Sequence, residues 1–127
     1  MGNDERDPLS HAVLGAAFEV ANVLGHGFLE AVYRRALVGE LMRRKIPVRE
    51  EVGFPIFYKG EDVGRYIADI VADDRMIIEL KCADALSRAH VAQTINYLKA
   101  SNISTALLLN FGKPKIEYRR IILSSPI

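Results

Sequence analysis

Residues 63–81 of this chain, VGRYIADIVADDRMIIELK, decide how the protein folds. Val63 to Val71 and Met76 to Lys81 are rich in isoleucine and valine, which is typical of β-strands. Between these two predicted strands, the three residues Asp73-Asp74-Arg75 are typical of a turn. We therefore predict two strands that pair side by side as an antiparallel hairpin.

The length of this turn decides which side chains of the two strands face each other. A three-residue loop places Asp69 directly opposite Glu79, with Cβ atoms about 4.5–5.5 Å apart. A two-residue loop would instead pair Asp69 with Ile78 and turn Glu79 to the wrong face. Side chains alternate between the faces of a strand, so Glu79 and Lys81 point the same way. By the same alternation Ile78 and Leu80 point into a core. We predict the three-residue register, which brings Asp69, Glu79 and Lys81 together.

The elements around this hairpin follow from hydrophobic periodicity and from glycine and proline positions. We predict helices over residues 10–24, 28–44 and 87–99, and further strands over 52–58, 103–109 and 116–123. Ser10 and Ser87 are the predicted N-caps, and Pro55 indicates that its strand is an edge strand or starts late. The order α-α-β-β-β-α-β-β predicts an α/β (α+β) fold with a central mixed sheet flanked by helices. We expect a flexible N-terminal segment at 1–8 and a single domain at 9–127.

The composition narrows the class of protein. The chain has 127 residues, a formal net charge of +1 and one cysteine, Cys82, so no intrachain disulfide is expected. The charge provides no strong attraction to nucleic acid or to anionic membranes, although it leaves room for a local basic groove. The acidic, polar residues 1–7 lack the basic start and apolar stretch typical of a signal peptide, and the longest apolar run, within Ala106 to Leu109, is too short to cross a bilayer. We expect a soluble cytoplasmic protein with no membrane partner.

The predicted cluster of two carboxylates and a lysine has a definite chemistry. Neighbouring carboxylates repel each other, and a divalent cation such as Mg²⁺ removes that conflict while keeping several waters. Lys81 can orient an attacking water or stabilise charge on a phosphate. The alternative is a surface hairpin whose Asp69, Glu79 and Lys81 form solvated ion pairs. The apolar residues around these charges favour a metal site over the surface hairpin, because charged residues within apolar strands are seldom mere surface residues.

These residues resemble those of a known family. Asp69 followed by Glu79-Leu80-Lys81 resembles the PD-(D/E)xK nuclease superfamily, with Ala68 in place of the proline. Gly27-Phe28-Leu29-Glu30-Ala31-Val32-Tyr33 resembles the motif of its GxxExxY branch, and the resemblance continues through residues 93–99 and 110–112. It implies a restriction-endonuclease-like core, a metal held by Asp69 and Glu79, and Lys81 as the catalytic lysine.

The same resemblance implies supporting roles on two helices. Glu30 would complete or orient the metal shell, and Gln93 and Tyr97 would support the active site. From the residues alone, Gln93, Tyr97 and His90 are equally compatible with the solvated side of a helix. The basic residues 34–35, 43–45, 113, 115 and 119–120 are either surface solvation or a phosphate-tracking surface. Few exposed aromatic residues are expected for base stacking, so sequence-specific readout of single strands is not indicated.

We interpret the chain as a nuclease dependent on Mg²⁺ or Mn²⁺ that hydrolyses phosphodiester bonds of nucleic acid. In this hypothesis the catalytic residues are Glu30, Asp69, Glu79, Lys81, Gln93 and Tyr97, and the metal ligands are Asp69, Glu79 and Glu30. DNA is favoured over RNA, and a homodimer would let a chain without other domains address two strands. The alternative is a non-catalytic module that keeps the nuclease fold and binds nucleic acid or protein. A third option is a metal-binding hydrolase of small phosphoesters.

Overall fold

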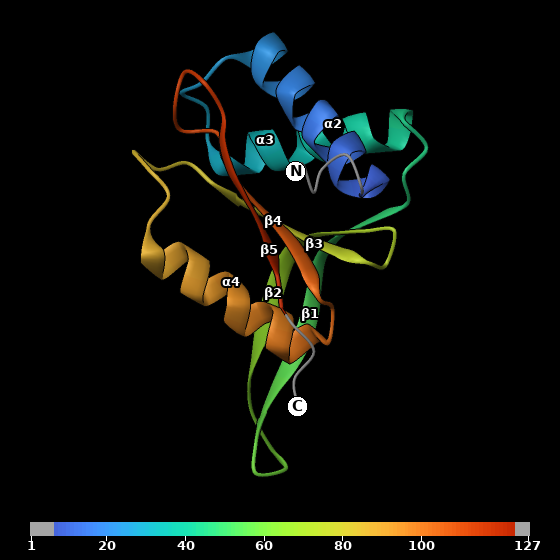
Figure 1. Ribbon diagram of the computed structural model, residues 1–127, viewed down its shortest axis with the longest axis vertical. Helices are drawn as coiled ribbons and strands as arrows, with labels where there is room; N and C mark the ends of the chain where they lie inside the picture. Colours follow the sequence, from blue (N-terminus) through green and yellow to red (C-terminus); the bar gives the residue numbers. More distant parts are fainter. Residues whose placement is uncertain (1–6, 124–127) are drawn as a thin grey trace.

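The computed structural model describes residues 7–123 (Figure 1). The elements in chain order are α2 (Pro8–Leu24), α3 (Glu30–Arg43), β1 (Val48–Tyr58), β2 (Glu61–Ala72), β3 (Met76–Lys81), α4 (Arg88–Ser101), β4 (Thr105–Asn110) and β5 (Glu117–Ile122). The predicted order α-α-β-β-β-α-β-β is thus confirmed. Among the described residues, no helix is long and apolar enough to span a bilayer.

The five strands form one mixed sheet in the order β1-β2-β3-β4-β5. All neighbouring strands are antiparallel except β3 and β4, which are parallel. A parallel pair needs a crossover connection, and α4 supplies it. β1 lies at one edge of the sheet, which confirms the interpretation of Pro55, although the strand begins at Val48 rather than at residue 52.

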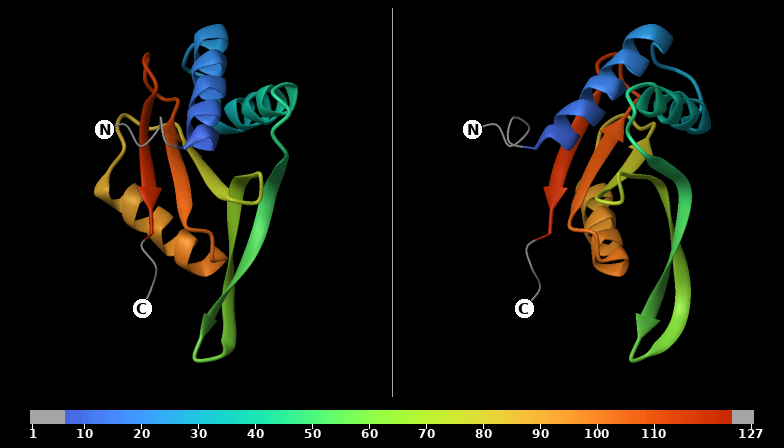
Figure 2. Two further views of the ribbon diagram at one scale, coloured as in Figure 1. Left: turned by 45° about the vertical axis from the view of Figure 1, so that its right-hand side comes forward. Right: turned by 90° about the vertical axis from the view of Figure 1, so that its right-hand side faces the viewer.

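Helices cover both faces of the sheet (Figure 2). Residues of α2 and α3 pack with Ile70, Ile78 and Leu80 in the larger hydrophobic cluster. Leu98 of α4 packs with Ile77 in the smaller cluster on the opposite face. The predicted alternation along β3 is therefore confirmed, because Ile78 and Leu80 face α2 and α3. Both faces of β3 are buried, which explains its almost continuous apolar sequence.

The sequence predicted the N-cap of α4 correctly but not the N-cap of α2. Ser87 caps α4 as predicted, and His90 completes a reciprocal capping box with it. The N-cap of α2 is Asp7, not Ser10: Asp7 accepts from the Leu9 N–H, and Pro8 occupies the first helical turn. Ser10 is buried and donates its hydroxyl to Asp7 instead. Asp7 and Pro8 thus belong to the helix start, and residues 1–6 of the predicted flexible segment lie outside the described residues.

The β1–β2 hairpin extends well beyond the body of the sheet, as the lower part of Figure 1 shows. Its turn is only Lys59-Gly60, shorter than the four residues, 59–62, that separate the two predicted strands. Several of its large apolar side chains are exposed, including Phe57, Tyr58 and Val63. The hairpin arm is therefore a surface rather than part of the core.

Candidate active site

The three-residue turn gives the register on which the site depends. β2 and β3 pair through Ile70 with Ile78, Val71 with Ile77 and Ala72 with Met76, so the next facing positions are Asp69 and Glu79. The predicted register is confirmed, but the paired positions stop at Ile70 and Ile78. Beyond them each carboxylate accepts a hydrogen bond from the opposite backbone.

These reciprocal bonds hold both carboxylates in place. The Leu80 N–H donates to Oδ2 of Asp69 at 2.8 Å, and the Asp69 N–H donates to Oε2 of Glu79 at 3.1 Å. Both acceptors are buried or half-buried. Two strands that end their pairing here thus use carboxylates to satisfy their backbone donors, which fixes the direction of both side chains.

Strand β2 changes face just before Asp69. Ile70 and Ala72 pack toward α2 and α3, and strict alternation would place Ala68 with them. Ala68 instead packs in the cluster on the α4 face. On β1 the facing residue, Glu51, has φ 54° and is left out of the pairing. Irregularities of this kind re-aim side chains next to active sites.

Tyr66 is a residue of this site that the sequence analysis missed. Its hydroxyl donates to Oε2 of Glu79 at 2.6 Å. Its ring is stacked on Tyr97, with ring centroids 3.4 Å apart, and on Phe54 at 6.0 Å. Tyr66 lies three residues before Asp69, so regular alternation puts the two on opposite faces. Only the change of face along β2 brings them together.

Burial and mutual repulsion shift the pKa values of the acidic residues. Burial, followed by the negative charge of Asp69, raises the pKa of Glu79 to about 7. Burial also raises the pKa of Asp69, against the opposing effects of the Leu80 N–H bond and the charge of Lys81. Burial and the charge of Asp69 raise the pKa of Glu30. The ionised forms of these three carboxylates are therefore unfavourable in the protein without a bound cation.

The donor set fits a divalent cation. One oxygen of each carboxylate accepts a backbone N–H, while Oδ1 of Asp69 and Oε1 of Glu79 have no hydrogen-bond partner within residues 7–123. No buried side-chain oxygen in that part of the chain lacks a partner, so these two oxygens reach solvent. Two carboxylate oxygens beside water suit Mg²⁺, which keeps several waters when bound.

Glu30 is close enough to act electrostatically but does not join a compact ligand group. It is the first residue of α3 and influences the site through charge. Across residues 7–123, no three side chains of histidine, cysteine, aspartate or glutamate lie where they could hold one metal ion together. Glu30, the predicted third ligand, therefore lies near Asp69 and Glu79 but does not form a three-residue ligand group with them. A role through an intervening water stays a prediction.

The loop before Glu30 is held by the tyrosine of the same motif. Tyr33 is fully buried, donates its hydroxyl to the Gly25 carbonyl at 2.6 Å and accepts from the Phe28 N–H at 3.2 Å. Gly27, with φ 113°, supplies a backbone conformation that glycine favours. The motif therefore shapes the turn from which Glu30 projects.

Lys81 is held by a helix and by a loop. Its Nζ donates to Oε1 of Gln93 on α4 at 3.1 Å, so the structure brings Gln93 to Lys81, while its role in catalysis stays a prediction. The Phe111 N–H donates to the Lys81 carbonyl at 2.9 Å, and the Phe111 ring stacks on Tyr33 at 4.7 Å. Asn110 bonds both backbone groups of Ala83. Residues 110–112 thus brace the chain directly after Lys81.

Of the remaining candidate residues, Tyr97 contacts the site, whereas His90 and five of the basic residues make other contacts. Tyr97 supports the site through its stack on Tyr66, whereas His90 serves the cap of α4. Five of the predicted basic residues form ion pairs with carboxylates: Arg34, Arg43, Arg44, Lys113 and Arg120. These ion pairs favour a structural or surface role for the five residues over contact with phosphates.

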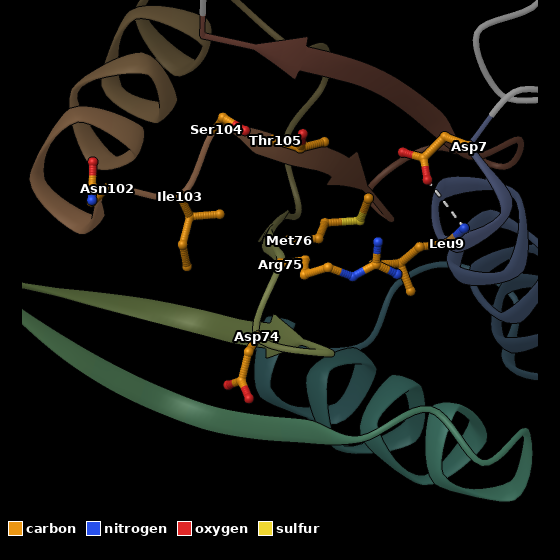
Figure 3. Close-up of a pocket in the computed structure, with 9 residues that line it drawn as sticks. All are labelled: Asp7, Leu9, Asp74, Arg75, Met76, Asn102, Ile103, Ser104 and Thr105. Carbon is orange, nitrogen blue, oxygen red and sulfur yellow. Dashed lines mark hydrogen bonds between the residues drawn. The ribbon is translucent and has the colours of Figure 1, made fainter. Parts of the chain in front are cut away.

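A pocket of about 340 Å³ lies away from this site (Figure 3). Met76 and Thr105, which line it, are the first residues of β3 and β4, whereas Glu79 and Lys81 lie toward the end of β3. None of the predicted site residues lines it. A larger groove, described below, adjoins Gln93 and Tyr97 instead.

Comparisons with solved structures agree with the observed fold. The search of curated proteins found no match. The solved structure described as the crystal structure of SSO0001 is similar with a TM-score of 0.60 and 19% identity, over 76% of this chain and 52% of that one. LHK-Exo in complex with dAMP is similar with a TM-score of 0.51 and 13% identity, over 85% and 76% of the two chains. This chain therefore spans about half the length of SSO0001.

The family comparison covers almost the whole chain. A family model described as the PD-(D/E)XK nuclease superfamily matches residues 7–121, which include every predicted site residue. The match is to the superfamily, and assignment to the GxxExxY branch stays a prediction. With Asp69, Glu79 and Lys81 in the predicted register, the chain belongs to the PD-(D/E)XK nuclease superfamily.

Proposed function

We propose that this protein is a nuclease that hydrolyses phosphodiester bonds with the help of Mg²⁺ or Mn²⁺. The observation that carries the proposal is the facing pair Asp69 and Glu79, with the Lys81 ammonium held beside it by Gln93. Membership of the superfamily supports the reaction class. LHK-Exo was solved with dAMP, a deoxynucleotide, which favours DNA over RNA as the first substrate to test.

Each residue has a role that follows from its contacts. Asp69 and Glu79 would hold the cation through the oxygens that the backbone leaves free. When bound, the cation would act as a Lewis acid on a phosphate oxygen and would lower the pKa of an attacking water.

Lys81 acts as a positioned donor. Gln93 restrains its ammonium group, which can donate to the attacking water or to a phosphate oxygen as negative charge develops. Tyr66 keeps Glu79 in its observed orientation, and Tyr97 supports the Tyr66 ring. Glu30 would act on the water shell through its charge.

Cleavage of labelled DNA and RNA, single-stranded and duplex, in Mg²⁺ or Mn²⁺ tests the proposal. Lys81→Ala should reduce cleavage by about 100-fold or more while leaving cation binding in place, because it removes a donor used in the transition state. Glu79→Gln should lose both cleavage and cation binding. The matched controls are Lys59→Ala and Glu19→Gln, which change exposed residues and should behave as wild type.

The outcomes separate the three hypotheses. If a folded protein cuts no nucleic acid and calorimetry detects no cation binding, the non-catalytic module is favoured. If it hydrolyses only small phosphoesters, the third option is favoured. If Lys81→Ala cuts as fast as Lys59→Ala, the assignment of the site is wrong.

A further inference from the structure

A groove lies beside the candidate active site, between strand β1 and helix α4. It has a volume of about 610 Å³, and its walls include Ile56 and Phe57 from β1 and Gln93, Asn96, Tyr97 and Lys99 from α4. Two of these residues also serve the site: Gln93 accepts from Lys81, and Tyr97 stacks on Tyr66. A molecule in the groove would therefore touch the same side chains that position Lys81 and Tyr66.

A strand irregularity lies at the β1 wall. Neighbouring residues of a strand normally point to opposite faces, yet Ile56 and Phe57 both line the groove. The register shifts between them, since Ile56 pairs with Gly64 and Phe57 with Asp62, which leaves Val63 of β2 as the extra residue. A bulge of this kind bends the strands and increases their twist locally. Phe57, a 60% exposed aromatic residue, lines the groove at this point.

The lining has the chemistry of a nucleotide subsite. Phe57 and Tyr97 offer aromatic surface, Gln93 and Asn96 offer amide donors and acceptors, and Lys99 offers a positive charge. No carboxylate lines the groove, so a phosphate in it meets no direct repulsion. Its volume lies within the range of about 300–1,000 Å³ that small-molecule sites occupy. The expectation that few aromatic residues are exposed is wrong, because the exposed residues of the described chain include Phe18, Phe28, Phe57, Tyr58 and Tyr118.

We propose that this groove binds an unpaired base of single-stranded nucleic acid next to the bond that is cut. The proposal rests on the proposed function and deepens it. The base stacks on Phe57 and against Tyr97, and Lys99 contacts a neighbouring phosphate. A base inside a duplex is already stacked and paired, so only a single strand or a frayed end presents a free face.

Binding in EDTA tests the groove separately from catalysis. Fluorescence anisotropy of the full chain compares labelled oligo(dT) with a blunt duplex of equal length. Phe57→Ala should weaken single-strand binding by about 5- to 100-fold, the usual effect of removing one stacking aromatic residue. Tyr58→Ala is the matched control, because Tyr58 is the adjacent aromatic residue, 61% exposed, and is not among the residues that line the groove.

A second variant tests the phosphate contact. Lys99→Gln should lower the slope of log affinity against log salt by about 0.7, the value expected for one phosphate on a single strand. Both substitutions change exposed residues, so circular dichroism should show an intact fold.

Three results would overturn the groove assignment. They are Phe57→Ala binding as tightly as Tyr58→Ala, a blunt duplex binding as tightly as the single strand, or no measurable single-strand binding. If wild type cuts nucleic acid while Phe57→Ala matches Tyr58→Ala, the groove fails and the nuclease stands. If Phe57-dependent binding occurs without cleavage in Mg²⁺ or Mn²⁺, the nuclease fails and the groove stands.

Discussion

Replacing Glu79 by glutamine should remove the contribution of Glu79 to the pH dependence of stability in the metal-free protein. A pKa raised from 4.5 to about 7 corresponds to about 3 kcal/mol of stability, because the folded state prefers protonated Glu79. That stability is fully present below the unfolded pKa of 4.5 and is lost as the pH rises through about 7. The amide of Glu79→Gln stays neutral throughout, and its oxygen can still accept from Tyr66 and the Asp69 N–H.

Urea unfolding in EDTA at about pH 5 and about pH 8.5 measures this difference. Between the two conditions, wild type and the exposed control Glu19→Gln should lose about 2–3 kcal/mol more than Glu79→Gln. The loss that remains in Glu79→Gln comes from Asp69 and Glu30, whose pKa values burial also raises. Hydrogen bonds lower the pKa values of Asp7 and Glu117, so their contributions are lost only as the pH falls below that range. Equal losses in wild type and Glu79→Gln would refute the account of a buried, repelled carboxylate.

Added Mg²⁺ or Mn²⁺ extends the same experiment. A ligand that binds only the folded state stabilises it by about 2.7 kcal/mol at a concentration 100 times its dissociation constant. The gain in wild type should be large at high pH, where Glu79 is ionised, and small at low pH, where a proton occupies the site. Glu79→Gln should gain little in either condition. A gain that is equal in both proteins would place the cation elsewhere.

Three further predictions concern the residues around the site and the helix start. Tyr66→Phe removes a hydrogen bond to the charged form of Glu79, so the pH midpoint of Mg²⁺-dependent stabilisation should move upward in a pH series of melting curves. Gly112→Ala places a Cβ 2.6 Å from backbone atoms of Ala83 and should cost about 1–3 kcal/mol in urea unfolding. Asp7→Ala removes the α2 cap and should cost about 1 kcal/mol or more in the same assay.

A control variant or a contradicting result tests each of these three predictions. Gly39→Ala, whose nearest neighbour is 3.7 Å away within a helix, should be stabilising by about 0.5–1 kcal/mol. Asp7→Asn keeps a capping oxygen and should retain most of the stability that Asp7→Ala loses. An unchanged pH midpoint in Tyr66→Phe would mean that the hydroxyl does not act on Glu79.

The sequence by itself determined the central features of the site. The three-residue turn at 73–75 sets Asp69 opposite Glu79, because register follows from loop length. Alternation along β3 places Glu79 and Lys81 on one face, since a strand repeats every two residues. The order of elements and the Ser87 cap were likewise predictable from local chemistry.

The tertiary structure decided which distant residues complete the site. Tyr66 reaches Glu79 only because β2 changes face before Asp69, and a periodic pattern carries no sign of that change. Gln93 meets Lys81 because α4 packs across the sheet, whereas the sequence left its helix face open between site and solvent. Asp7 and Ser10 can both cap a helix, and contact with Arg120 of β5, 113 residues from Asp7, joins them in one network. Local sequence sets register and face, but contacts between segments far apart in the chain depend on how whole elements pack.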